Sequence, residues 1–148
     1  DFGFRDKAGT ERHSIVHSGM VDLPWGIKFS TLSKFGSGLA YQVFDANTAP
    51  YFSVNTNKIY SAYPKKNCMG IFARCEVDVT FEKDFTLFND HAMTFSVDVF
   101  NIFNNKNYSG YNGFICCGDG SPFDPSTATA SSLLTLPRRV QFRGSYRF

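Results

Sequence analysis

The sequence predicts an all-β protein built from antiparallel strands, and three observations carry this prediction. Residues 136–148 alternate: Val140, Phe142, Gly144, Tyr146 and Phe148 share one face, and polar residues that include three arginines share the other. Alternation of period two over a whole strand is typical of a sheet with one apolar face. Aromatic residues make up 17% of the 148 residues, with 17 Phe among them, which favours strands. No run approaches the roughly 18 apolar residues of a membrane helix, so the chain is soluble or crosses a membrane only as strands.

Two further strands are predicted in the first third of the chain. Residues 11–24 form the first, because Ile15, Val21 and Leu23 share a face, although Val16 and Met20 interrupt the pattern. The Pro-Trp-Gly sequence at 24–26 predicts a tight turn. Residues 27–45 form the second strand, in which closely spaced glycines at 36 and 38 indicate a bulge or close packing.

Two more strands are predicted in the middle of the chain. Residues 71–82 alternate most cleanly after the terminal strand, with Ile71, Cys75 and Phe81 on the apolar side. Residues 92–104 follow after a short connection around 88–90. The polar stretches 46–67 and 105–135 are predicted to be long loops.

The connections between the five predicted strands alternate between short and long. Antiparallel barrels of the outer membrane have short periplasmic turns and long extracellular loops. With the carboxy-terminus at the periplasmic end, every short turn falls on that side, and loops 46–67 and 105–135 fall outside. The sequence therefore predicts an up-and-down transmembrane β-barrel, with apolar side chains toward lipid and polar ones toward the lumen.

Five strands are too few to close such a barrel, since the smallest kind has about eight. Unpaired strand edges in hydrocarbon would leave backbone groups unsatisfied. We therefore expect residues 1–148 to be the carboxy-terminal part of a larger barrel. The first ten residues contain no apolar stretch of a signal peptide, so we expect a mature product or an internal fragment, and the strand count favours the fragment.

Four stretches carry a family resemblance: residues 13–25, 76–85, 97–108 and 137–148. They resemble the last strands of TonB-dependent outer-membrane receptors, most closely the Oar-like branch. The sequence V-D-V-F-N-I-F-N at 97–104, followed by a loop and an arginine-rich terminal strand, is the most specific part. The resemblance covers most of the chain from about residue 12 onward, apart from the two long loops.

The resemblance implies a barrel of about 22 strands with an amino-terminal plug, in the outer membrane of a Gram-negative bacterium. The expected function is TonB-dependent uptake of an extracellular solute. The expected partners are the rest of the barrel, the plug, the TonB system and outer-membrane lipid. Neither plug nor TonB-contacting segment lies in these residues, and no ligand-binding residue is carried over. The resemblance also implies that an outward signature at the carboxy-terminus is read during membrane insertion, formed by Val140, Phe142, Tyr146 and Phe148.

Charged side chains follow the polar faces of the last three predicted strands. Opposite charges on neighbouring strands suit cross-strand pairs, each worth roughly 0.2–1 kcal/mol. These residues are expected to line the lumen and contact a plug or solute, or else to form a solvated face that stabilises the sheet. An arginine should then be tolerated at Ser96 and not at Val97. The lumen-facing set is Arg74, Glu76, Asp78, Glu82, Asp98, Arg139, Arg143 and Arg147.

The periplasm and the cell surface permit disulfides, and four cysteines allow three pairings. Cys68, Cys116 and Cys117 lie in or beside the two long loops, on one side of the predicted barrel. This placement allows a loop disulfide between Cys68 and either Cys116 or Cys117. Cys75 shares parity with the apolar strand face and is expected to be a small buried or lipid-facing residue.

The sequence offers no catalytic, metal-binding or cofactor-binding constellation, so an enzyme is not expected and no cofactor is implied. A net charge of +2 without long basic runs argues against nucleic acid as a partner. Two alternatives stay open beside the transporter. One is a structural or adhesive outer-membrane barrel without an uptake role, and the other is a soluble β-sandwich binding module.

Overall fold

The computed structural model describes residues 7–45, 58–66, 68–88, 91–112, 114–115 and 128–148. The chain divides into two compact units. The sheet unit comprises Ser14–Phe35, Cys75–Lys106 and Thr135–Phe148, and the connection unit comprises Asp1–His13, Gly36–Arg74 and Asn107–Leu134. The protein is all-β, with antiparallel sheets, as the sequence predicts. Within the described ranges, no helix is long and apolar enough to cross a bilayer.

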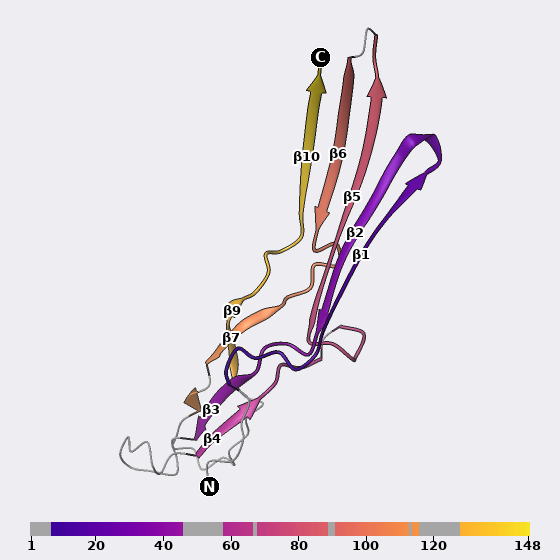
Figure 1. The fold of residues 1–148 in the computed structure, drawn as a ribbon. Helices are drawn as coiled ribbons and strands as arrows, with labels where there is room; N and C mark the ends of the chain where they lie inside the picture. Colours follow the sequence, from indigo (N-terminus) through magenta and orange to yellow (C-terminus); the bar gives the residue numbers. More distant parts are fainter. Residues whose placement is uncertain (1–6, 46–57, 67, 89–90, 113, 116–127) are drawn as a thin grey trace. The chain divides into compact units, whose positions relative to one another are not determined.

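The sheet unit is one five-stranded sheet. Its strands are β1 (Ser14–Leu23), β2 (Ile27–Gly36), β5 (Arg74–Thr86), β6 (Ala92–Phe100) and β10 (Arg139–Arg147). Their order is β1-β2-β5-β6-β10, so among the described residues the sheet is open, with β1 and β10 at its edges. The strands lie side by side in a single layer (Figure 1). The short 3-10 turn η1 (Pro24–Gly26) joins β1 to β2.

Neighbouring strands of this sheet run in opposite directions (Figure 1). The end of β1, the end of β5 and the carboxy-terminal end of β10 all lie at one end of the sheet. The two short connections are therefore on the same side as the carboxy-terminus, as the alternation of connection lengths predicts. Pairing between strands is regular: Val97 of β6 lies opposite Phe81 of β5 and Phe142 of β10.

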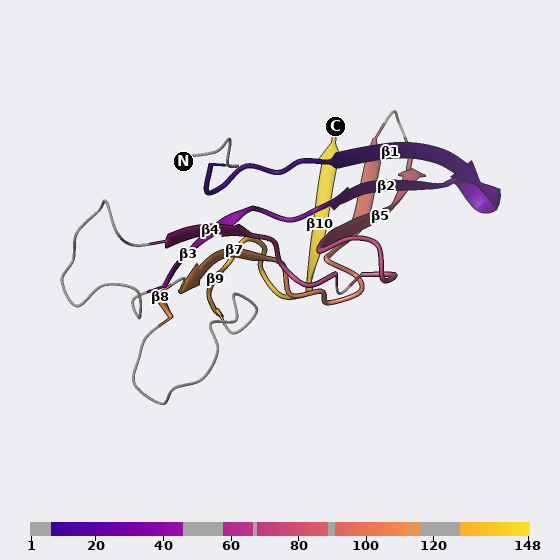
Figure 2. The same ribbon diagram turned by 90° about the horizontal axis from the view of Figure 1, so that it is seen from below.

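The connection unit holds short strands that the sequence did not reveal (Figure 2). A three-stranded sheet has the order β4-β3-β8, from β3 (Tyr41–Asp45), β4 (Lys58–Ala62) and β8 (Phe114–Ile115). β3 pairs antiparallel with β4 and parallel with β8. A second, two-stranded sheet joins β7 (Tyr108–Asn112) to β9 (Thr129–Leu133). The prediction that 46–67 and 105–135 are plain loops is therefore wrong at β4, β7, β8 and β9.

The predicted strand over residues 27–45 is two strands, and the glycines between them explain the break. Gly38 adopts a φ of +78°, and Gly36 lies so close to Glu11 that a Cβ there would meet its carboxylate. Backbone bonds from Ser37 to the carbonyl of His13 (2.9 Å) and from Ala40 to that of Thr10 (2.9 Å) join this turn to the amino-terminal segment. The glycines thus mark close packing, as expected.

Two predicted strand boundaries also shift. β5 begins at Arg74, so Ile71 lies in the preceding loop and not on a strand face. β6 ends at Phe100 because Asn101 adopts a φ of 51°, outside the extended region. The core is small: Val43, Ala40 and Cys75 are the most buried apolar residues among those described.

Candidate functional site

One face of the five-stranded sheet carries large apolar side chains that are open to the surroundings. We call it the apolar face. Phe29 of β2 contacts Phe81 of β5 with ring centroids 5.1 Å apart, and Phe95 of β6 stacks with Phe142 of β10 at 6.4 Å. Phe142 is 68% exposed. The exposed members on β5, β6 and β10 are Phe81, Phe85, Met93, Phe95, Val140, Phe142 and Tyr146.

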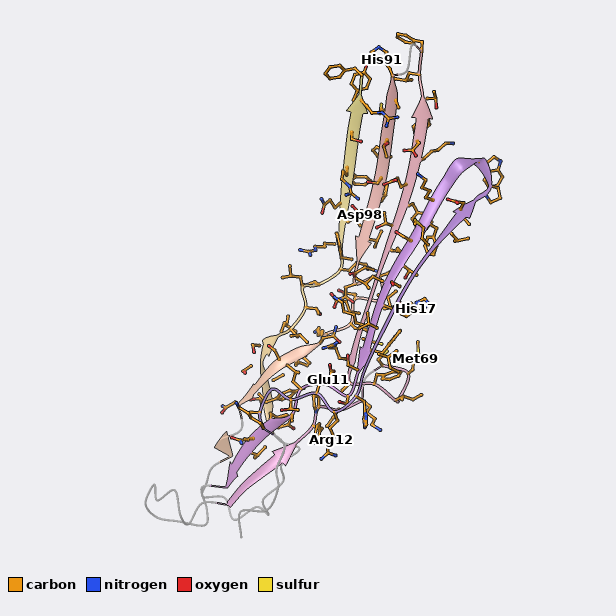
Figure 3. All side chains as sticks on the ribbon, viewed as in Figure 1. Glu11, Arg12, His17, Met69, His91 and Asp98 are labelled. Carbon is orange, nitrogen blue, oxygen red and sulfur yellow. The ribbon has the colours of Figure 1, made fainter. Side chains whose placement is uncertain are left out.

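The opposite face, which we call the polar face, holds a connected set of hydrogen bonds centred on Asp98. The Thr80 hydroxyl donates to Asp98 Oδ1 (2.7 Å), and Arg143 Nη2 lies 3.3 Å from both carboxylate oxygens. Arg143 Nε also donates to Ser96 Oγ (3.0 Å). Asp98 and Ser96 are only 6% and 2% exposed. One network therefore joins β5, β6 and β10. Figure 3 labels Asp98 on β6.

A second set of polar contacts joins β2, β5 and β6. Lys28 Nζ lies 2.8 Å from Asp84 Oδ2 and 3.9 Å from a carboxylate oxygen of Glu82. The Thr94 hydroxyl donates to Asp84 Oδ1 (2.6 Å). Farther along, Lys34 pairs with Glu76 (3.5 Å). Three of the four strand pairs of the sheet, β2–β5, β5–β6 and β6–β10, are thus each linked by ionic or charge-assisted bonds on the polar face.

The chain leaves β6 through a turn that asparagines build. The side-chain amide nitrogen of Asn101 donates to the backbone carbonyls of Asn105 (2.9 Å) and Leu136 (3.1 Å). The side-chain oxygen of Asn101 accepts a hydrogen bond from the backbone N–H of Asn105 (3.0 Å). Asp78 Oδ1 accepts from the backbone N–H of Asn101 (2.8 Å). Asn104 has a φ of 53° and accepts from the Arg138 backbone (3.0 Å). The asparagines at 101, 104 and 105 therefore connect the end of β6 to the start of β10.

Aromatic rings gather on the sheet unit at the end of β10. The Tyr146 hydroxyl and His91 Nδ1 are hydrogen-bonded at 2.8 Å, with their rings stacked at 5.7 Å. Phe88 lies 5.8 Å from His91, and Phe148 lies 6.3 Å from Tyr146. Three of the four residues of the predicted terminal signature, Val140, Phe142 and Tyr146, are exposed members of the apolar face. Phe148 follows directly after the strand and is 92% exposed.

The predicted lumen-facing charges do not all join one network. Asp98, Arg143, Glu76, Asp78 and Glu82 lie in the contacts just described. The Arg139 guanidinium lies 4.7 Å from the centroid of the Phe100 ring, and Arg147 is exposed at the end of β10. Arg74 belongs to the connection unit, where its Nη1 lies 2.8 Å from Glu11 Oε2. Ser96 accepts a hydrogen bond from Arg143. An arginine in place of Ser96 would lose this bond, so position 96 does not suit the substitution that alternation alone predicts to be tolerated.

Glu11 is a residue that sequence reasoning did not single out. Besides its ion pair with Arg74, it accepts a hydrogen bond from the Gly38 backbone (3.1 Å). The Glu11 and Arg74 side chains are both largely shielded from solvent. In the sequence, the glycines at 36 and 38 indicate that another group packs closely against them. No pattern in the sequence identifies that group as the Glu11 side chain.

A cluster of tyrosines lies in the connection unit. Tyr41 of β3 stacks on Tyr111 of β7 at 4.1 Å, and Tyr108 meets Tyr111 edge-on at 6.0 Å. Burial, and then the neighbouring Tyr41 and Tyr108, raise the pKa of Tyr111 from 10.0 to about 12. The cluster therefore packs β3 and β7 together around a hydroxyl that resists ionisation.

Cys68 and Cys75 are both disulfide-bonded. For Cys68 this agrees with the disulfide that the sequence allows. The two cysteines named as its partners, Cys116 and Cys117, lie outside the described residues. For Cys75 the expectation of a small buried residue did not include the disulfide that the structure gives it. It is buried at 1% exposure as expected, but its position next to the start of β5 lets its sulfur reach another cysteine. Strand parity indicates which face a side chain occupies, and it carries no information on covalent partners.

Among the described residues, no three His, Cys, Asp or Glu side chains gather in a way that could hold a metal ion. Comparison with known proteins found no matching family model, no matching curated protein and no matching solved structure.

Proposed function

We propose that the five-stranded sheet is part of a transmembrane β-barrel in the outer membrane of a Gram-negative bacterium. The apolar face contacts lipid and the polar face lines the lumen. The rest of the barrel pairs with the outer edges of β1 and β10, because an unpaired strand edge in hydrocarbon leaves several kcal/mol of backbone polarity unsatisfied per group.

A single observation carries this proposal: the sheet has its polar side chains bonded to one another and its aromatic side chains exposed. A soluble antiparallel sheet normally packs its apolar face against a core and wets the polar face. Here Phe142 is 68% exposed and Asp98 is 6% exposed. A continuous exposed apolar surface marks an interface with another protein or with lipid. Alternation of apolar and polar residues around a barrel wall gives this arrangement.

Two further features support the proposal. The short connections and the carboxy-terminus share one end of the sheet (Figure 1), as in barrels with short periplasmic turns. The aromatic rings of Phe88, Tyr146 and Phe148, with the exposed Trp25 in η1, occupy the strand ends and turns, where barrels carry aromatic girdles.

Within this class we propose an active transporter of the TonB-dependent receptor type. The support for this narrower step is the sequence resemblance and the charged polar face, which suits a lumen wall facing a plug or a solute. A structural or adhesive barrel would share the lipid-facing half of the argument. Uptake of an extracellular solute distinguishes the transporter from the structural or adhesive barrel. For the transporter, this uptake should be lost in a strain without TonB.

The lipid-facing half can be tested with a fluorescent amino acid inserted by codon suppression, which leaves the cysteines untouched. The protein is expressed from its complete gene and reconstituted in vesicles whose lipids carry bromine on the acyl chains. The probe replaces Phe142 in one variant and its neighbour Gln141 in the matched control. We expect quenching at 142 and much weaker quenching at 141. Equal quenching at both positions, or none at either, would refute the membrane-spanning sheet.

A further inference from the structure

One lysine of the sheet unit lies on the apolar face. Lys83 of β5 alternates with Phe81 and Phe85, which are exposed members of that face, and it lies opposite Phe95 of β6. Residues two positions apart in a strand share a face. By this parity, Lys83 is the only charged side chain on the apolar face of the described strands β5, β6 and β10.

The Lys83 ammonium has no carboxylate at ion-pair distance in the part of the chain that the structure describes. Its neighbours Glu82 and Asp84 belong to the polar face, where Lys28 Nζ lies 3.9 Å and 2.8 Å from their oxygens. Lys83 Nζ lies 5.2 Å from the centroid of the Phe85 ring. A ring face attracts a cation, but it does not supply the hydrogen-bond acceptors that an ammonium group takes. The donors of Lys83 are therefore open to an acceptor from outside.

The position of Lys83 Nζ over Phe85 shows that the side chain reaches toward the end of β5, because Phe85 is the last but one residue of that strand. On the neighbouring strands Met93 lies opposite Phe85, and Tyr146 lies opposite Met93. The Tyr146 hydroxyl is bonded to His91, which Figure 3 labels at the start of β6. Lysine stems follow apolar surface while the charged head reaches a polar boundary. The ammonium thus lies level with aromatic rings that carry polar groups at the strand ends.

We propose that Lys83 binds the headgroup phosphate of an anionic phospholipid whose acyl chains lie along the apolar face. The phosphate oxygens accept hydrogen bonds from the ammonium, and the chains cover exposed rings such as Phe81 and Phe95. A free phosphate ion would leave these rings uncovered. The ligand that matches both the cation and its apolar surroundings is an amphiphile with an anionic head.

This inference rests on the proposed function, since it needs a sheet that spans the bilayer with its apolar face toward lipid. The end of β5 lies at the same end of the sheet as the carboxy-terminus (Figure 1). In the proposed barrel that end is periplasmic, so the bound phospholipid belongs to the periplasmic leaflet. Lys83 then fixes the depth of β5 in the membrane through a specific lipid.

The test places the same fluorescent amino acid at Met93, beside Phe85, in the protein expressed from its complete gene. Vesicles contain equal amounts of phosphatidylcholine and phosphatidylglycerol, and only one of the two lipids carries bromine on its acyl chains. The quenching by brominated phosphatidylglycerol, divided by that by brominated phosphatidylcholine, measures the preference for the anionic lipid. We expect a preference of about fivefold, the effect of one lysine near an anionic headgroup.

Three variants assign the preference to the ammonium group. K83Q should lower it to about one, whereas K83R should keep it, because a guanidinium group also binds phosphate. K34Q is the matched control, since it removes the same charge from the polar face, where Lys34 pairs with Glu76. The preference should not change in K34Q. A near-ultraviolet dichroism spectrum checks that each variant has folded, and the probe-bearing parent and K83R still decide the test if K83Q does not fold.

The probe at position 142 separates failure of this inference from failure of the proposed function. Quenching at 142 with no lipid preference at 93 overturns the lipid site and leaves the barrel. A preference that survives in K83Q, or is lost equally in K34Q, overturns the role of Lys83. A preference at 93 that depends on Lys83, without quenching at 142, supports the lipid site on a sheet that touches the membrane only at this end, and it overturns the barrel. No quenching at either position overturns both.

Discussion

The strength of the ion pair between Asp98 and Arg143 depends on whether water reaches the polar face. Asp98 is nearly buried, but the Arg143 side chain is 58% exposed, so water reaches the cation. For a pair open to water the coupling should be that of a surface ion pair, about 0.2–1 kcal/mol. A pair sealed from water would lose about 3–5 kcal/mol when one partner is removed.

The single substitutions should be unequal. Asp98→Ala removes the bond from Thr80 to a charged acceptor, worth about 1.5–3 kcal/mol, together with the ion pair, so its cost should be about 2–4 kcal/mol. Arg143→Ala removes the ion pair and the bond to Ser96, and should cost about 1–2 kcal/mol. Because Arg143 is the exposed partner, the smaller cost belongs to it.

The measurement is a double-mutant cycle on D98A, R143A and the double variant. Free energies of unfolding come from guanidinium titrations in lipid vesicles, with the slope checked for a common two-state transition. A coupling above about 3 kcal/mol would show that the polar face is packed dry and would refute a water-lined wall. Equal costs for the two single variants would refute the asymmetry of exposure on which the reasoning stands.

Three further outcomes are expected from the connection unit and the asparagine turn. G36A should destabilise the connection unit by about 1–3 kcal/mol, since the added methyl meets the Glu11 carboxylate, and native-state hydrogen exchange should localise the loss there. N101G keeps access to the φ of 51° but loses three side-chain hydrogen bonds and should cost about 2–4 kcal/mol, whereas N104G loses one and should cost about 1 kcal/mol in the same unfolding titration. The pKa of Tyr111 is raised by burial to about 12, so above pH 10 the unfolded chain releases this proton before the folded one does. Stability should therefore fall between pH 10 and 12, and Y111F should reduce the fall; an unchanged slope would contradict the assigned pKa.

The five long strands could be predicted because alternation indicates where each strand lies and which face each residue takes, although it did not give their ends. β5 and β10 alternate over nine or more residues, so the side of each residue follows from its parity. Turn residues marked the short connections, and the alternation of short and long connections predicted that the short ones lie at one end of the sheet. A long segment with period-two alternation fits a strand and does not fit a helix or a loop.

The short strands of the connection unit could not be predicted on the same grounds. β4 and β9 are five residues each, β9 consists mostly of Ser, Thr and Ala, and the pairing of both strands depends on partners elsewhere in the chain. The Glu11–Arg74 pair joins residues far apart in sequence, which no local pattern encodes. The oxidised state of Cys75 was missed for the same reason.

The arrangement of carboxylates on β5 also selects how that strand aligns with β6. A slip of two residues returns every side chain to its original face, so the apolar pattern cannot distinguish it from the native alignment. In the native pairing Asp98 lies opposite Thr80. A two-residue slip in one direction brings Glu82 opposite Asp98, and in the other direction it brings Asp78 there. Like charges directly opposite one another destabilise a strand pair, so both slipped alignments meet repulsion where the native one finds a hydrogen-bond donor. Thr80, with Asp78 and Glu82 two residues away on either side, therefore favours the native alignment of β5 and β6 through contacts on the polar face.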